Sequence, residues 1–410
     1  MRNATNTPAD ELHSRMIAAI TAHSPHRPRT IDAMSAVPRL GFLREINPDV
    51  TAEDAYDPEL AVITLKDPET GATLSCSSVP TLVATMLDQA DVQPGDRVLE
   101  IGSATGINAA YLAHLAGPDG EVTTLDIDPW VTAGTRRALD ANGYKQVRVV
   151  TRDGALGYAE AAPYDKIVVT VGAFDLAAAW WDQLAPDGRI VVPLRWRGQT
   201  RSLALVLDRD RLVSESVVLC GFVPMIGQVG ERSAAIDSAD TVRLYWDEDQ
   251  AINPAVLAGV LDHAKTETWT GVMIVSEEPF DGIWLRMTAE DPGTCRIEAK
   301  PAAVMSGLCT PAIPVRSPAI AEGESLAYLV LLRSQGQALQ QQWELGTAAH
   351  GPTGHQLADR LCAQIRAWAA SRAEEPRVVA FRQVMATGDQ RGSVLIAKRD
   401  CSMRIKYSTR

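Results

Sequence analysis

The stretch "VLEIGSATGINAAYLA", residues 98–113, decides the fold. An apolar run ends in an acidic residue, a turn of glycine and other small residues comes next, and an alanine-rich segment follows. This order predicts a buried strand, a tight turn and a helix. A glycine-rich turn lets a ligand approach the backbone closely, and the helix dipole favours negative charge at the start of the helix. The stretch therefore predicts a ligand site at the end of a strand.

The same alternation of strand and helix extends over residues 79–207. Short β-rich runs alternate with helical segments, which predicts a parallel sheet with helices on both faces. Residues 202–225 add two antiparallel strands, and two helices are predicted ahead of the sheet within residues 9–43. The sequence thus predicts an α/β, Rossmann-like fold. Its strands are expected at 97–102, 121–127, 147–153, 166–172 and 189–194, and its helices at 80–90, 107–116, 129–142 and 175–185.

The length of the chain predicts a second domain, because 410 residues exceed the usual size of one core. The segment "GQVGERSAAIDSAD" at 227–240 is small and polar, as linkers are. We expect a catalytic domain at 1–228, a linker at 229–240 and a C-terminal α+β domain at 241–410, which could contribute to binding a peptide substrate. Helices are predicted in that domain at 254–266 and 354–372, and strands at 271–276, 282–288 and 325–334.

Composition and charge narrow the class of protein. A net charge of −12 argues against nucleic acid or an anionic membrane as a partner. The polar start and the absence of a long apolar run predict a cytoplasmic protein with no membrane span. The six cysteines are scattered without a C-x-x-C pair. They are expected to be reduced, with neither a zinc site nor a disulfide framework, and the sequence does not indicate an oligomeric state.

Acidic residues close successive predicted strands. Glu100 closes the first, Asp126 closes the second about 20 residues after the glycines, and Asp153-Gly154 follows the third. A carboxylate at the second position can accept hydrogen bonds from both ribose hydroxyls, and one at the third can accept from an exocyclic amine. The turn lacks the third glycine of a dinucleotide motif. These features indicate S-adenosylmethionine (SAM) more than NAD, although an acid in such a place could also be a helix cap.

Segments along residues 30–228 resemble the protein-L-isoaspartate O-methyltransferase family. They occur in the family's order and include "AVPRLGF", "DAYDPEL", "TLSCSSVPTLVATML", "TRDGALGYAEAAPYDKIVVT" and "GFVPM". In the family the Ser-x-Pro segment lies beside the methyl group of the cofactor and the substrate carboxylate, so the resemblance implies that Ser78 is the catalytic residue. Ser77 and Ser78 could instead cap the helix that begins near Pro80.

The resemblance completes the expected site. SAM is expected to bind at Glu100, Gly102, Ser103, Ala104, Gly106, Asp126, Ile127, Asp153 and Gly154. The substrate is expected to contact Tyr56, Asp57, Ser77, Val79 and Val171. A carboxylate is already an anion at neutral pH, so its methylation requires orientation and exclusion of water and no general base.

Departures from the family pattern bear on the substrate. Ala104 and Ile107 replace a usual glycine and a usual aromatic residue, and Arg152 replaces a glycine. The whole chain also resembles actinobacterial members with a C-terminal extension that accompany ribosomal peptides such as lanthipeptides and graspetides. That resemblance implies methylation of an aspartate in a macrocyclic peptide, leading to aspartimide or isoaspartate. The alternatives are repair of isoaspartyl residues in damaged proteins, an NAD-dependent oxidoreductase, and a SAM-binding scaffold.

Overall fold

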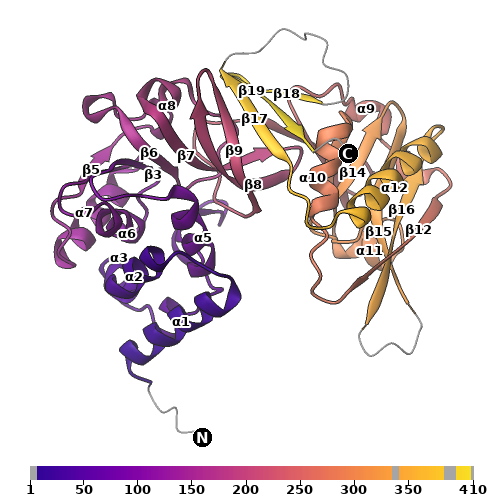
Figure 1. The fold of residues 1–410 in the computed structure, drawn as a ribbon. Coiled ribbons are helices and arrows are strands. Elements are labelled where there is room, and N and C mark those ends of the chain that lie inside the picture. The colour runs from indigo at the N-terminus through magenta and orange to yellow at the C-terminus, as the bar shows by residue number, and fades with distance from the viewer. Residues whose placement is uncertain (1–6, 335–340, 383–393, 408–410) are drawn as a thin grey trace, which may run out of the picture. The chain divides into compact units, whose positions relative to one another are not determined.

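The computed structural model describes residues 7–334, 341–382 and 394–407. The chain divides into two compact units, whose elements are shown in Figure 1. The first unit runs to Leu194 and also contains Thr200–Gln228, and the second contains Arg195–Gln199 and the chain from Val229 onward. Among the described residues, no helix is both long and apolar enough to cross a bilayer.

The first unit contains the predicted α/β sheet. Its strands follow the order β9-β8-β7-β6-β3-β4-β5, and β5, β4, β3, β6 and β7 pair in parallel. The chain reverses its direction of winding between β3 and β6, and ligands bind at such a point in open α/β sheets. The bounds are β3 Arg97–Ile101, β4 Glu121–Asp126, β5 Arg148–Thr151, β6 Tyr164–Val169, β7 Leu184–Trp196, β8 Gln199–Asp208 and β9 Arg211–Leu219.

Helices cover this sheet, and a short hairpin lies between them in the chain. The helices α2 and α3 are separated at Pro38; α2 packs against α5 and α6, and α3 packs against α7. The bounds are α1 Ala9–His23, α2 Pro28–Ala36, α3 Arg39–Ile46, α4 Ala52–Ala55, β1 Val62–Lys66, β2 Thr73–Ser77, α5 Pro80–Ala90, α6 Ile107–Ala116, α7 Pro129–Ala141, η1 Gly154–Leu156, η2 Ala159–Ala161 and α8 Ala178–Gln183.

The helix predicted at 175–185 is shorter than expected. Helix α8 begins only at Ala178, because the backbone before it is engaged elsewhere. The N–H of Gly172 donates to the carbonyl of Val223 at 2.8 Å, and the N–H of Met225 donates back to the carbonyl of Gly172 at 2.9 Å. This bridge ties the end of β6 to the segment that follows β9.

The second unit is built on a seven-stranded antiparallel sheet of order β10-β11-β13-β14-β15-β16-β12. One face packs against α10 and α12, and the other carries a separate apolar core that includes residues of α9, η3 and α11. The bounds are β10 Glu231–Ala235, β11 Val242–Asp247, α9 Pro254–Leu257, η3 Val260–Asp262, β12 Thr266–Val275, α10 Gly282–Glu290, β13 Thr294–Ala299, α11 Pro301–Met305, β14 Ser317–Glu322, β15 Ser325–Arg333, β16 Gln342–His350, α12 Gly354–Ala370, β17 Arg377–Arg382, β18 Leu395–Ala397 and β19 Cys401–Lys406.

The structure differs from the predictions in three segments of this unit. Residues 282–288 form helix α10 where a strand was predicted, because Ile283, Trp284 and Met287 are buried at helical spacing. The helix predicted at 254–266 is two short pieces, α9 and η3, since Gly259 between them has a φ of 78°. Part of the predicted linker forms strand β10, which pairs with β11 and so is part of the sheet.

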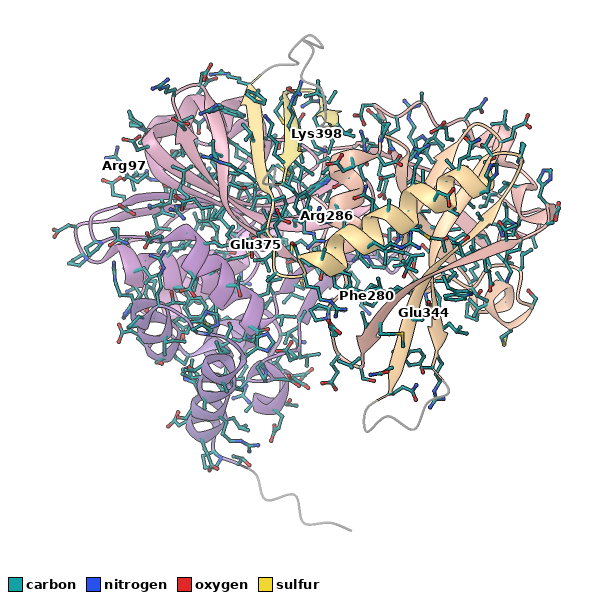
Figure 2. The ribbon with its side chains drawn as sticks, turned by 45° about the vertical axis from the view of Figure 1, so that its right-hand side comes forward. Arg97, Phe280, Arg286, Glu344, Glu375 and Lys398 are labelled. Carbon is teal, nitrogen blue, oxygen red and sulfur yellow. The ribbon has the colours of Figure 1, made fainter. Side chains whose placement is uncertain are left out.

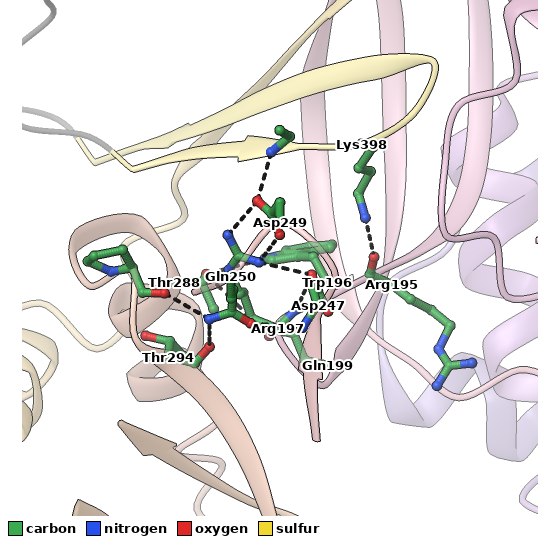
Figure 3. A network of polar contacts seen from close by, with 12 residues as sticks. Arg195, Trp196, Arg197, Gln199, Asp247, Asp249, Gln250, Thr288, Thr294 and Lys398 are labelled. Carbon is green, nitrogen blue, oxygen red and sulfur yellow. Dashed lines mark hydrogen bonds and ion pairs between the residues drawn. The ribbon is translucent and has the colours of Figure 1, made fainter. Parts of the chain in front are cut away.

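A buried ionic network lies within the second unit (Figure 3). Arg197 pairs with Asp249 through both terminal nitrogens, and its backbone N–H donates to Asp247 at 2.9 Å. Asp249 also accepts from the N–H of Ala397 at 3.0 Å, which fixes β18. Removing one partner of a buried ion pair leaves an uncompensated charge, so this network constrains the fold around residues 195–199.

Arg286 and His350 are two side chains of this unit that contact aromatic rings. Arg286 of α10 lies over the ring of Tyr407, 3.9 Å from its centroid (Figure 2 labels Arg286). His350 is buried and stacks on Tyr328, with ring centroids 6.1 Å apart. The last residue of β16 faces the apolar core in place of solvent, so the histidine belongs to that core.

Candidate active site

A cavity opens where the winding of the sheet reverses. The cavity and the solvent space at its open mouth together take up about 850 Å³. Its walls come from the ends of β3, β4 and β6, the segment after β5, the β1–β2 hairpin and the segment 222–226. A second cavity of about 540 Å³ lies next to it, beside β2, α3, α5 and α6. The two cavities share Cys76, Gly102, Ala104, Thr170 and Phe222.

The glycine-rich turn separates β3 from α6 and lines both cavities. Gly102 has a φ of 102°, and an added Cβ would lie 2.6 Å from Oγ1 of Thr170, so only glycine fits there. Ala104 also adopts a left-handed φ, 43°, at the position where the family usually has glycine. The backbone of this turn is therefore held in a conformation that its sequence accommodates at some strain.

Most N–H groups of the turn are already hydrogen-bonded within the protein. Gly102 and Ser103 both donate to the carbonyl of Leu125, at 2.8 and 2.9 Å, and Gly106 donates to the carbonyl of Ser103 at 2.7 Å. The N–H of Ala104 donates to Asp126 at 3.3 Å. These four N–H groups are therefore engaged within the protein and leave little for a pyrophosphate, and contact of the turn with SAM stays a prediction.

Asp126 lines the first cavity at the end of β4. It accepts from the N–H groups of Ala104 and Asp128, each at 3.3 Å, and burial raises the pKa of its carboxyl above the ordinary value. The alternative that Asp126 caps a helix is not met, because Asp128 caps α7. Ile127 beside it also lines the cavity and is 42% exposed, so apolar surface adjoins the carboxylate.

The segment after β5 forms the opposite part of the same cavity. Asp153 lines it and accepts from the N–H of Ala155 at 2.9 Å, so one carboxylate oxygen caps the short helix η1. A Cβ added to Gly154 would lie 2.4 Å from Cγ2 of Ile101. The position therefore requires glycine for close packing against β3.

Glu100 lies beneath the turn and lines neither cavity. It is fully buried, and it accepts from Nδ2 of Asn108 at 2.7 Å and from Oγ1 of Thr124 at 2.5 Å. Burial raises the pKa of its carboxyl to about 7. The structure thus places Glu100 as a support that joins β3, β4 and α6, and its contact with a cofactor stays a prediction.

Ser77 and Ser78 line the second cavity. The N-cap of α5 is Val79 and no side chain caps that helix, so the alternative that these serines are caps is wrong. Among the described residues neither hydroxyl has a hydrogen-bond partner, and the Ser77 oxygen is buried. Two hydroxyls with unused hydrogen-bonding capacity therefore face a cavity next to the glycine-rich turn.

The other predicted substrate residues are dispersed. Val171 lines the first cavity, whereas Tyr56, Asp57 and Val79 line neither. Tyr56 is buried and stacks on His13, with ring centroids 4.9 Å apart. Asp57 accepts from the N–H of Glu59 at 2.9 Å in a turn. Contact of these three residues with substrate stays a prediction.

Several lining residues were not predicted from the sequence. Arg39, Thr170, Phe222 and Met225 border the cavities, and the first belongs to "AVPRLGF" while the last two belong to "GFVPM". Both segments carried the family resemblance without any role attached to a residue. An arginine after Val-Pro within an otherwise apolar segment was the signal that could have identified Arg39.

The residues of the first cavity suit SAM. Asp126 and Asp153 at neighbouring strand ends offer acceptors for a ribose and an amine, and apolar side chains lie between them. Because most N–H groups of the turn are already bonded, few donors remain for a pyrophosphate. This fits a ligand that has no pyrophosphate. A parallel sheet with a ligand site at its switch point is common to several α/β folds, and the lining of this site favours the SAM-dependent methyltransferase class among them.

The comparison with known proteins narrows that class. Residues 11–230 match the family described as protein-L-isoaspartate(D-aspartate) O-methyltransferase, and the chain belongs to this family. It is therefore a SAM-dependent carboxyl methyltransferase.

Two curated relatives and one solved structure illustrate what this chain is similar to. The protein-L-isoaspartate O-methyltransferase of Methanothrix thermoacetophila is 35% identical over 50% of this chain and 91% of its own. Protein-L-isoaspartate O-methyltransferase 2 of Archaeoglobus fulgidus is 32% identical over 56% of this chain and 99% of its own. A solved structure named protein-L-isoaspartate O-methyltransferase covers 90% of this chain and 96% of its own, with 17% identity and a TM-score of 0.49.

We expect Asp126→Asn to weaken SAM binding by about 1.5–3 kcal/mol, the range for a hydrogen bond to a charged group. Asparagine keeps an acceptor for the N–H of Ala104, so the turn is preserved while the charge is removed. Calorimetric titration with SAM measures the effect, and Asp119→Asn at an exposed loop is the control. Unchanged affinity in Asp126→Asn would remove this residue from the site.

Glu100 is expected to make stability depend on pH. Its pKa is about 7 in the folded protein and near the ordinary 4.5 when unfolded, so the folded state binds the proton more tightly. The contribution of Glu100 to stability is then fully present below pH 4.5 and is lost as pH rises to about 7. Relative to Glu100→Gln, the wild-type protein should lose up to about 3 kcal/mol over that interval. Urea unfolding of both proteins across this range tests it, with the exposed Glu121→Gln as control; parallel curves would contradict it.

Proposed function

We propose that this chain methylates the free carboxylate of isoaspartyl residues in proteins or peptides. The observation that carries the proposal is the pair of adjoining cavities that share the glycine-rich turn. Two aspartates line one cavity, and two serine hydroxyls with no partner among the described residues line the other. The names of the relatives, all isoaspartate methyltransferases, support the same substrate.

The residues of the site suffice for this chemistry. When bound, SAM supplies an electrophilic methyl group. The carboxylate of the substrate is an anion at neutral pH, so no residue of the chain has to remove a proton. Ser78 and Ser77 would donate hydrogen bonds that orient that carboxylate, and the apolar wall of Val83, Ile107 and Phe222 would keep water away.

A macrocyclic aspartyl peptide is the second candidate substrate. It follows from the resemblance to peptide-tailoring relatives and from Ile107, which replaces a usual aromatic residue and is a buried part of the second cavity wall. The family match spans residues 11–230, so the second unit lies outside it. On this reading the second unit would help to bind the larger substrate, and aspartimide or isoaspartate would follow from the ester.

One comparison of substrates distinguishes the two. A linear isoaspartyl peptide, the same sequence with aspartate, and its cyclised aspartyl form are assayed for transfer of a radioactive methyl group from SAM. We expect the isoaspartyl peptide to be methylated fastest and the linear aspartyl control to be inert. Faster methylation of the cyclic aspartyl peptide would overturn the proposal in favour of peptide tailoring.

Ser78→Ala is expected to reduce kcat on the preferred peptide by about 10- to 100-fold, because a hydrogen bond to a charged group is lost at the reacting carboxylate. SAM affinity should change much less. Steady-state kinetics and calorimetry separate the two effects, with Ser77→Ala tested beside it and the exposed Ser35→Ala as control. A wild-type kcat in Ser78→Ala would leave this serine without a role in catalysis.

A further inference from the structure

Arg39 carries a buried charge with no acidic partner. Its side chain is the first of helix α3 and is 1% exposed. Among the described residues no carboxylate forms an ion pair with it, although buried charges are normally paired because desolvation is costly. Consistent with this, burial lowers the pKa of the guanidinium below its ordinary value. A guanidinium nevertheless stays protonated in proteins.

The titratable neighbours of Arg39 do not neutralise it. They are Tyr56, Cys76 and Tyr111, and burial raises the pKa of each above its ordinary value. All are therefore neutral at physiological pH. The positive charge of Arg39 is uncompensated by these side chains.

Only part of the guanidinium is used within the protein. Its Nη2 donates to the carbonyls of Ser77 and Ser78, at 3.0 and 2.8 Å, which holds the segment between β2 and α5 in place. Its Nε is buried without a partner in the described chain. An arginine presents five N–H donors in a planar fork that matches a carboxylate, and donors remain for one here.

The side chain of Arg39 borders a cavity that a ligand can enter. It lines the second cavity together with both serines and the start of α6, whose helix dipole adds positive potential. Of the described residues that line the two cavities, it is the one cation. Four N–H groups of the turn, those of Gly102, Ser103, Ala104 and Gly106, are already bonded within the protein, so the turn offers the ligand few donors.

We propose that Arg39 is a carboxylate-binding residue of the active site. The carboxylate that it binds has two sources. One is the isoaspartyl substrate, and for this source the inference rests on the proposed function. The other source is the carboxylate on the amino-acid end of the cofactor. In both cases the ligand supplies the missing counter-charge, and the same guanidinium holds the serine segment against it.

Two variants distinguish the effect of the Arg39 charge from the effect of its side-chain shape. Arg39→Met removes the charge and keeps a long apolar side chain, and Arg39→Lys keeps the charge without the fork. Arg44→Met is the matched control, because Arg44 is on the same helix, is exposed and also donates to a backbone carbonyl. Thermal unfolding of each variant in the full chain verifies that it is folded.

Binding is measured with two probes that differ in whether they carry the amino-acid group and its carboxylate. S-adenosylhomocysteine carries the carboxylate, whereas 5′-methylthioadenosine has the same nucleoside and sulfur without it. Methylation of the linear isoaspartyl peptide is measured as kcat and KM on the same variants. Retained binding of 5′-methylthioadenosine shows that the nucleoside site is intact, so any other loss is specific.

Either of two results supports the assignment. If Arg39 binds the cofactor, Arg39→Met should weaken S-adenosylhomocysteine by about 10- to 100-fold and leave 5′-methylthioadenosine unchanged. If it binds the substrate, both probes bind normally while KM for the peptide rises by a similar factor and Arg39→Lys restores part of it.

Two results overturn it. One is unchanged affinity for S-adenosylhomocysteine together with unchanged peptide kinetics in a folded Arg39→Met protein. The other arises when the wild-type protein methylates none of the peptides. In that case, unchanged affinity of Arg39→Met for S-adenosylhomocysteine overturns the assignment. Absence of methylation by the wild-type protein by itself refutes the proposed substrate, independently of the binding result for Arg39.

Discussion

The hydrogen bonds that join the turn after β3 to the end of β4 are the constraint on which the site depends. One carbonyl, that of Leu125, accepts from both Gly102 and Ser103, so the chain must leave β3 in a left-handed conformation. The next N–H, of Ala104, meets the carboxylate of Asp126. The turn thereby holds an acid at the cavity and uses the N–H groups of Gly102, Ser103 and Ala104 within the protein. The one cation among the described residues that line the two cavities, Arg39, comes from another part of the fold.

The parallel sheet could be predicted from the sequence because its signal is local. The alternation of β-rich runs and helices, the glycines of the turn and the acids at strand ends are all read within short windows. Asp126 and Asp153 were identified in this way, and both line the first cavity. Glu100 lies at the end of β3 as predicted, but its side chain bonds Asn108 and Thr124, and its contact with SAM stays a prediction.

The remaining parts of the site depend on long-range contacts. Arg39 is far from the glycine-rich turn in the chain, and only the packing of α2 and α3 against the later helices brings it beside Ser77 and Ser78. In the second unit, the strand predicted at 282–288 is a helix because a short apolar run fits either structure. In the fold, burial of this run against α12 and the sheet favours the helix over the strand.

The place of Arg39 at the start of α3 has a consequence for how the protein is made. During synthesis α1 to α3 leave the ribosome before any of the strands that form the sheet. Helix α2 packs against α5 and α6, and α3 packs against α7, so these contacts form only once the later helices have been made. The two aspartates of the first cavity lie at strand ends, whereas Arg39 borders the second cavity from the start of α3. The acids thus depend on the sheet for their position, and the cation depends on the packing of helices.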